Sequence, residues 1–436
     1  KRGRAFGIFY MMVNVGGFLG PVIAGYVRAI SWDHVFWLSS IAIGINLLIA
    51  LFFLEDDSPE RVQTAVDQEK DQSCADPLLQ TASLEPTAKA IHDTSSGDEN
   101  DAMQSATSAA MADAIEVLGN GRFALMLIPI ILGLMIAGGG WIAWRDYGLF
   151  LLFWCGAQVI WDRLVPDAAS KTSWYGQKLR VGNAPFLVYL LVLSLFWAVY
   201  NQIFLTFPLY IQDFVNTSDA VAIAQSFSDA FAQFIAPVDD ARLGEALGTL
   251  SVTQPEPIEA FRTLVQYQVR VPEAELVSGL NALSSGSASV DSLASEWASK
   301  FRQISPEYII AFDFLSIVLF QYFISRWGEN RAPFGMLILG TGMIGAAFVI
   351  GGMSHMVAFG GVLTIASVIV FAFGEMLAAP KSQEYVASTS SPEQAALFQG
   401  YYFVSIAIGY LLAGIMSGWA YGEIAVKANQ PFVMWS

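Results

Sequence analysis

The sequence predicts an all-α integral membrane protein whose transmembrane helices form a bundle. Hydrophobic residues make up 55% of the 436 residues, and only 14% are charged. The apolar residues come in long blocks, several of which have roughly the 20 residues that an α-helix needs to cross a bilayer. Such helices are stable in lipid because they satisfy their own backbone hydrogen bonds.

The first apolar block, residues 6–27, has no charged side chain but contains Asn14. An amide in hydrocarbon is costly without a partner, so we expect the Asn14 side chain to point into the protein or into a water-filled cavity. Gly16 and Gly20 stand four residues apart, and Pro21 follows them. We expect this small-residue face to let a neighbouring helix approach closely.

The later apolar blocks predict further helices. They cover residues 35–54, 123–144, 148–164, 186–211, 308–324, 334–352, 357–379 and 397–421. Residues 122–165 should form a helical hairpin, with its turn at the short polar stretch 145–147. In the last block, Gly414 and Gly418 predict a second close-packing face.

Two polar segments interrupt the apolar blocks. Residues 55–121 are rich in Asp, Glu, Ser, Thr and Gln, and they predict a disordered loop because they cannot bury enough apolar surface to fold. Residues 212–304 contain short helical patterns and predict a helical insertion. Within it, Phe227, Phe231 and Phe234 recur at helical spacing, which predicts a small core or a packing face. The sequence identifies no protein partner for this insertion.

Positive charge in the short loops predicts the orientation of the chain. If every apolar block crosses once, positive side chains gather on one side of the bilayer, at Lys1, Arg2, Arg4, the link 166–185, Arg326, Arg331 and Lys381. The first helix would then run outward. The acidic loop and the link 166–185 would be cytoplasmic, and the insertion 212–304 extracytoplasmic.

Two acidic residues, Asp313 and Glu375, lie inside apolar blocks. An ionised carboxylate at such depth costs about 2.5–3.5 kcal/mol on insertion scales unless it is paired, hydrated or protonated. Both are therefore candidates for handling protons or substrate. The alternatives are a structural partner for either acid and, for Asp313, a shallow solvated position.

An aromatic run at residues 196–202 ends in two adjacent amides. Aromatic rings and amides at membrane depth indicate the wall of a cavity, with Trp197, Asn201 and Gln202 as candidate substrate-binding residues. The alternative is that both amides form hydrogen bonds between neighbouring helices.

The sequence lacks the residue patterns of a disulfide framework, a metal site and a catalytic centre. Cys74 and Cys155 make no disulfide framework, and three scattered histidines have no metal-ligand spacing. No nucleophile is paired with a base, so we expect no enzyme, no cofactor and no metal. The net charge of −16 is concentrated in the two polar segments and indicates their solvation. We expect no nucleic-acid partner.

Two motifs carry a resemblance to a known family. The first is Phe6-x-x-Phe9-Tyr10-Met11-x-Val13-Asn14-Val15-Gly16-Gly17-Phe18, which resembles the fifth-helix signature of proton-coupled oligopeptide transporters, a branch of the major facilitator superfamily. The Gly20-Pro21 pair that follows is similar to a motif of the wider superfamily. The second is Gly374-Glu375 with Pro380, which is similar to the tenth-helix pattern of the peptide transporters.

The resemblance implies a role for two of these side chains. Asn14 and Glu375 would face a central cavity and hold the amino end of a peptide, and Glu375 would also take part in proton coupling. Asn201 stands where the family's seventh helix has an acid, so an ion pair made there by the family is absent. Ser305 replaces an asparagine at the start of the eighth helix, and the insertion 212–304 lengthens a usually short connection.

The expected architecture is a partial bundle of the superfamily with an extra hairpin and an extracytoplasmic helical insertion. Its parts would be two helices of the N-terminal half in 1–54, a transmembrane helix in 186–211, four helices of the C-terminal half in 305–421 and a truncated tail in 422–436. We expect a fragment that lacks four preceding helices and a final one.

The expected function is secondary active transport by proton-coupled symport of small peptides or related zwitterionic solutes, in the inner membrane of a bacterium. The lipid bilayer, protons and a small-molecule substrate would be its partners. One alternative is transport of another solute, such as a sugar or an exported amphiphile. The other is a receptor or assembly protein that does not transport.

Overall fold

The structure is a computed structural model that describes residues 2–28, 31–53, 119–164, 177–389 and 395–436. In these ranges the regular elements are helices, joined by two isolated β-bridges. The chain divides into two units, one of residues 1–26 with 110–436 and one of residues 27–109. In the second unit the described helix is α2, Trp32–Phe53. The predicted disordered loop 55–121 lies outside the described residues except for its last three.

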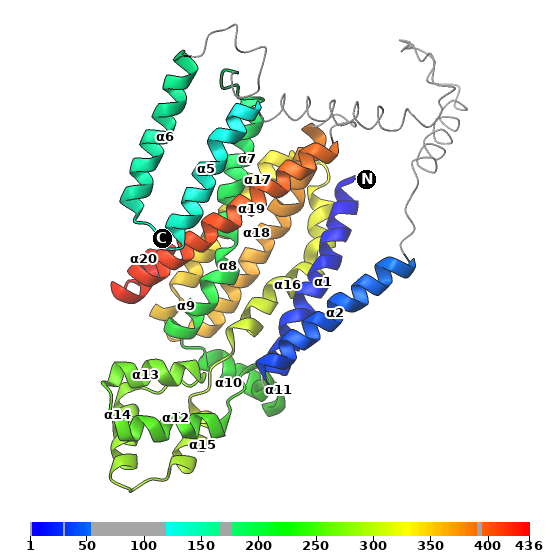
Figure 1. The fold of residues 1–436 in the computed structure, drawn as a ribbon. Helices are drawn as coiled ribbons and strands as arrows, with labels where there is room; N and C mark the ends of the chain where they lie inside the picture. The colour runs from blue at the N-terminus through cyan, green and yellow to red at the C-terminus, as the bar shows by residue number, and fades with distance from the viewer. Residues whose placement is uncertain (1, 29–30, 54–118, 165–176, 390–394) are drawn as a thin grey trace, which may run out of the picture. The chain divides into compact units, whose positions relative to one another are not determined.

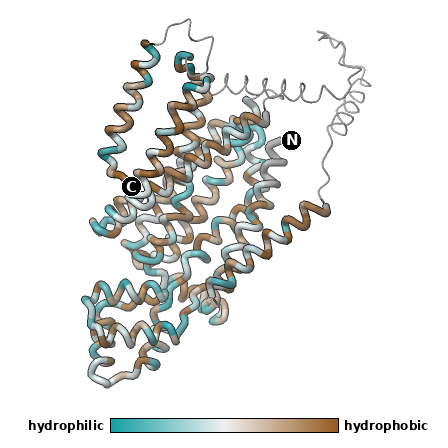
Figure 2. The backbone as a smooth tube through the Cα atoms, viewed as in Figure 1, coloured by the Kyte–Doolittle hydropathy of each residue, from teal (hydrophilic) through white to brown (hydrophobic). Residues whose placement is uncertain are grey.

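Seven described helices or helix runs are long and apolar enough to cross a membrane. They are Asp33–Phe52, Gly121–Gly138, Ala184–Phe214, Pro306–Gly328, Pro333–Met356, Gly360–Thr389 and Leu397–Lys427. Figure 2 shows hydrophobic residues along these helices, and a more hydrophilic chain in residues 216–303. The all-α membrane bundle predicted from the apolar blocks is confirmed.

The first unit contains a bundle of helices (Figure 1). These are α1 (Arg2–Arg28), α5 (Gly121–Gly138), α6 (Trp144–Leu164), α7 (Ala184–Tyr200), α8 (Gln202–Leu205), α9 (Phe207–Phe214), α16 (Pro306–Gly328), α17 (Pro333–Gly352), α18 (Gly360–Thr389) and α19 (Ala395–Trp419). The helices α7, α8 and α9 follow one another with breaks at Asn201 and Thr206.

The turn of the α5–α6 hairpin lies earlier than the sequence predicted. Residues 145–147 belong to α6, and the chain turns at residues 139–143 instead. Gly140 has a φ of +75°, a conformation that glycine adopts at little cost. Consecutive glycines therefore end the helix before the charged residues are reached.

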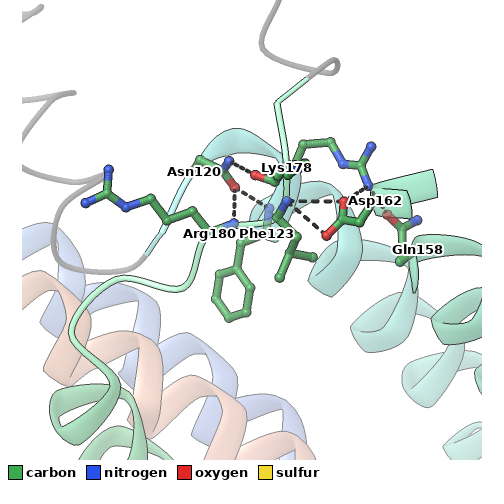
Figure 3. Close-up of polar contacts among 8 residues, drawn as sticks. Asn120, Phe123, Gln158, Asp162, Lys178 and Arg180 are labelled. Carbon is green, nitrogen blue, oxygen red and sulfur yellow. Dashed lines mark hydrogen bonds and ion pairs between the residues drawn. The ribbon is translucent and has the colours of Figure 1, made fainter. Parts of the chain in front are cut away.

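A set of polar contacts ties the hairpin to the segment before α7 (Figure 3). Asn120 caps α5 and donates from Nδ2 to the Lys178 carbonyl oxygen at 2.6 Å. The buried Arg122 donates to Gln158 at 2.9 Å and to Asp162 at 3.2 Å. Asp162 in turn accepts from the Leu179 amide. These contacts fix the two ends of the hairpin to the chain that leads into α7.

The helices α17 and α18 cross with their backbones in close approach. A Cβ added at Gly340 would come within 2.5 Å of the Gly374 carbonyl oxygen. Only glycine fits at such a crossing. The helices α7 and α19 meet in the same way, since a Cβ at Gly409 would lie 2.5 Å from the Trp197 Cβ.

The close contacts occur at glycines other than those predicted. Among the described residues, nothing lies within 4 Å of a Cβ added at Gly16, Gly20, Gly414 or Gly418. In α1 it is Gly17 that faces a neighbour, the ring of Phe314 in α16. Spacing alone does not show which face of a helix has a partner.

The insertion between α9 and α16 folds into a helical cap, which we define as residues 216–303. Its helices are α10 (Ser218–Phe227), α11 (Asp229–Ile235), α12 (Asp240–Thr253), α13 (Pro257–Gln266), α14 (Glu273–Ser284) and α15 (Val290–Lys300). The cap has its own apolar core around Trp297, Leu247 and Leu264. Of the two alternatives predicted for the phenylalanines, a small core is wrong, because Phe227, Phe231 and Phe234 are 80%, 47% and 40% exposed. A packing contact is present at Phe234, whose ring centroid lies 5.2 Å from that of Tyr308 in α16.

The last residues, predicted as a tail, are helical. A π-helix, η4 (Ala420–Lys427), continues α19, and α20 (Pro431–Trp435) follows. The Trp435 ring stacks on Phe348 of α17 with centroids 5.1 Å apart. This segment therefore packs on α17 beside the end of the bundle.

Candidate functional site

The two acidic residues of the apolar blocks meet inside the bundle. Asp313 lies on α16 and Glu375 on α18, and these helices pack against each other. Their side chains are 0% and 1% exposed. The structure thus brings together two carboxyl groups that the sequence predicted separately.

Two phenols donate to one oxygen of Glu375. Tyr200 of α7 donates to Oε1 at 2.8 Å, and Tyr10 of α1 donates to the same oxygen. Tyr10 also packs against Ile317 and Met376 of the neighbouring helices. One carboxylate oxygen therefore joins α1, α7 and α18.

The remaining carboxyl oxygens find no N–H or O–H donor among the described residues. These are Oε2 of Glu375 and both side-chain oxygens of Asp313. The two carboxyl groups are near enough for the charge of one to act on the other. If both were ionised they would repel, whereas one proton between them supplies the missing donor. Two neighbouring buried carboxyl groups of this kind are able to accommodate one proton.

Asn14 lies close to this pair but is bonded within its own helix. It is 4% exposed, and Nδ2 donates to the Tyr10 carbonyl oxygen at 2.8 Å. Tyr10 therefore bonds to both motif residues, to Asn14 through its carbonyl oxygen and to Glu375 through its hydroxyl. The Asn14 side chain is thus directed into the protein, as its position in an apolar block predicted.

The other three predicted substrate-binding residues lie where α7 packs on α19. Trp197 packs against Gly409 and Tyr402. The amide of Asn201 donates to the Trp197 carbonyl oxygen of its own helix at 2.7 Å. Gln202 donates to the Ala413 carbonyl oxygen of α19 at 3.2 Å. For Gln202 the structure shows the interhelical hydrogen bond that was the alternative to a cavity role.

The sequence did not single out Tyr10 and Tyr200 as site residues. Both lie in apolar runs that were noted for other residues, Asn14 in one case and the adjacent amides in the other. A phenol carries no charge, so its presence at membrane depth gives no energetic signal comparable with that of an acid. The available signal was position, because Tyr10 precedes Asn14 by one helical turn.

The arrangement can hold and release a proton. The hydrogen bonds from Tyr10 and Tyr200 to Glu375 each join two helices, so the strength of these contacts depends on the charge of the carboxyl group. Among the residues that the structure describes, no group of three or more His, Cys, Asp and Glu side chains could hold a metal ion. The groups that the structure brings together at this site are two carboxyl groups and two phenols.

Comparisons with known proteins place the chain in a family. The model of the Major Facilitator Superfamily matches residues 1–238, more than half of the chain. An uncharacterized MFS-type transporter of Schizosaccharomyces pombe (strain 972) is 33% identical over 79 residues, which cover 18% of this chain and 13% of the relative. No solved structure matches the chain. With its apolar helical bundle and this match, the chain belongs to the Major Facilitator Superfamily.

Proposed function

We propose that this protein is a proton-coupled secondary transporter in which the Asp313–Glu375 pair carries the coupled proton. Membership in the superfamily indicates a multi-pass membrane transporter with a small-molecule substrate. The observation that carries the finer proposal is the buried carboxyl pair, with Tyr10 reaching Glu375 from α1. Secondary transporters of this architecture work by moving one helical half against the other around a central site.

The protonation state of the pair would set which helices are held together. With one shared proton, Asp313 is bonded to Glu375 and Tyr10 holds α1 to α18. Loss of that proton places two negative charges side by side, which favours separation of the carboxylates. Because both are almost fully buried here, proton exchange requires the helices to part first. Exchange would therefore be linked to a change of access.

A small peptide or another zwitterionic solute is the proposed substrate. An ammonium group can replace the proton as the partner of Glu375, since both neutralise one negative charge. The resemblance of the Asn14 and Glu375 motifs to peptide-transporter signatures supports this class. A different solute is the second candidate. It is favoured by the amides of Asn14, Asn201 and Gln202, which are already bonded to backbone carbonyl oxygens.

The test measures uptake of labelled dialanine by proteoliposomes that contain the full-length protein, with and without an inward proton gradient. For Glu375→Gln we expect gradient-driven uptake to fall by about tenfold or more, within the range typical of coupling between two sites. Glu423→Gln is the matched control, since Glu423 is exposed and paired with Lys427. This control should behave as the wild type.

Two results would contradict different parts of the proposal. Normal gradient-driven uptake by Glu375→Gln would remove the proton role of the pair. If dialanine is not taken up at all, a thermal-shift screen with peptides, sugars and amphiphiles identifies the solute class. Gradient-driven uptake of a non-peptide solute would keep the proton role and replace the substrate.

A further inference from the structure

One cavity lies within the cap and another where the cap meets the bundle, and both are lined by Arg270. One has a volume of about 500 Å³, and the other of about 230 Å³. The residues Ile258 and Phe261 of α13 also line both. The smaller cavity is completed by Asp213 and Phe214 of α9 and by Val426 of η4. These cavities are separate from the carboxyl pair described above.

Arg270 is largely buried, and the described acid that acts on its charge is Asp213 of the same cavity. Its Nη2 donates to the Gln212 carbonyl oxygen at 3.0 Å, and its guanidinium lies 5.2 Å from the centre of the Phe261 ring. Its Nε is buried and has no acceptor among the described residues. Burial lowers the pKa of Arg270 to about 10, so the side chain remains a cation at neutral pH. A buried cation with a free donor requires an acceptor to offset its lost hydration.

The residues that line the smaller cavity carry a net positive charge. Arg262 and Arg270 line it together with a single acid, Asp213. Asp213 accepts a hydrogen bond from the Tyr421 hydroxyl, which stabilises part of its negative charge. In the larger cavity Glu273 is exposed, whereas Arg270 is not.

The rest of the lining is apolar. Ile258 and Phe261 are joined by Pro257, Val271 and Leu276 in the larger cavity, and by Phe214, Val265 and Val426 in the smaller one. A hydrated inorganic anion gains no free energy from contact with apolar side chains. An acyl or alkyl chain does, because its transfer from water to these side chains is favourable. The Nε–H of Arg270 that lacks an acceptor requires an oxygen, which a carboxylate or a phosphate supplies with a complementary charge.

We propose that the cavities around Arg270 bind the oxyanion head of an amphiphile, with its apolar part against Ile258 and Phe261. The ligand chemistry is an oxyanion on an apolar chain. Such a molecule can come from the bilayer, as an anionic phospholipid, or from solution, as a soluble amphiphile. This site lies outside the proposed proton site and does not depend on it.

The experiment uses the full-length protein in two arms. In the lipid arm, native mass spectrometry counts the phosphatidylglycerol and phosphatidylcholine molecules that the purified protein retains. In the soluble arm, octyl phosphate is titrated by calorimetry into protein held in phosphatidylcholine nanodiscs. For Arg270→Gln we expect loss of one retained phosphatidylglycerol or a Kd for octyl phosphate weaker by about tenfold or more. The arm that responds identifies the source.

Matched variants keep the test decisive if Arg270→Gln unfolds the cap. Ile258→Glu places a negative charge at a position that is 58% exposed, so it should weaken binding without disturbing the cap core. Arg242→Gln, on the exposed face of α12, should bind as the wild type. Unchanged lipid retention and an unchanged Kd in both Ile258→Glu and a folded Arg270→Gln would overturn the proposal. An equal loss in Arg242→Gln would also overturn it, because the effect would then be one of general surface charge.

Discussion

A single oxygen of Glu375 accepts hydrogen bonds from two phenols, those of Tyr10 and Tyr200, and the contribution of each can be tested by a single substitution. Tyr200 is 7% exposed, and Glu375 is 1% exposed. Inside the bundle neither group can turn to water if the other is removed. Each hydrogen bond should therefore be measurable as a difference in stability.

Replacement of Tyr200 by Phe removes one donor and leaves the ring in place. We expect the free energy of unfolding to fall by about 1 kcal/mol, as for interhelical hydrogen bonds in membranes. Thermal unfolding in detergent measures this effect, and Tyr410→Phe at a half-exposed position of α19 is the control. In the Glu375→Gln background the same replacement should cost less, because the charged acceptor is gone. Equal costs in both backgrounds would show that the bond to Glu375 does not stabilise the fold.

The sequence identified the acids of the site but not their pairing. Asp313 and Glu375 stood out because a carboxylate in an apolar block has a known cost. Their partners were not predictable, since hydrogen bonds between distant helices depend on which helix faces meet. Trp197 and Gln202 illustrate the same limit, because their place in a polar and aromatic run was evident but their partner helix α19 was not.

At the scale of helices, the crossing of α17 and α18 brings two helix backbones into direct contact. Gly340 and Gly374 face each other there. Any side chain at either position has to displace a carbonyl group. The neighbouring Gly342 of the same helix faces open space among the described residues.

Gly340→Val is therefore expected to lower the free energy of unfolding by about 1–3 kcal/mol, the usual cost of overpacking. Gly342→Val should have little effect, although it adds the same side chain to the same helix. Thermal unfolding followed by size-exclusion chromatography measures both variants. Similar melting temperatures for the two would show that the helices can separate at the crossing without cost.

The existence of the long helices was predictable from the apolar blocks, but their breaks and contact faces were not. The block 186–211 is divided at Asn201 and Thr206, which nothing in its hydropathy indicates. The glycine pairs in α1 and α19 have the spacing of a packing motif, and the described contact in α1 is at Gly17. Spacing reports which residues share a face, whereas contact depends on the tertiary arrangement.

At the scale of the whole molecule, the orientation of the cap follows from the number of crossings. If α5, α6 and the run α7–α9 each cross once, the acidic loop and the cap lie on opposite sides of the bilayer. The distribution of positive charge then predicts that the cap lies outside.

Labelling of single cysteines tests this orientation in intact cells with an impermeant maleimide. Val252→Cys in a background without Cys74 and Cys155 adds a thiol at a position of α12 that is 84% exposed. We expect it to react at once, and Cys74 alone to react only after the membrane is opened. Reaction of both thiols in intact cells would mean that one of the three crossings is missing.

The contact between Gly340 and Gly374 also constrains how the molecule can move. Because the two backbones touch without intervening side chains, we expect α17 and α18 to move together as one rigid body. Glu375 belongs to α18, and Trp435 of the C-terminal segment stacks on Phe348 of α17. A displacement that began at the buried acid would thus reach the C-terminal segment as a rigid tilt, without any change of conformation between them.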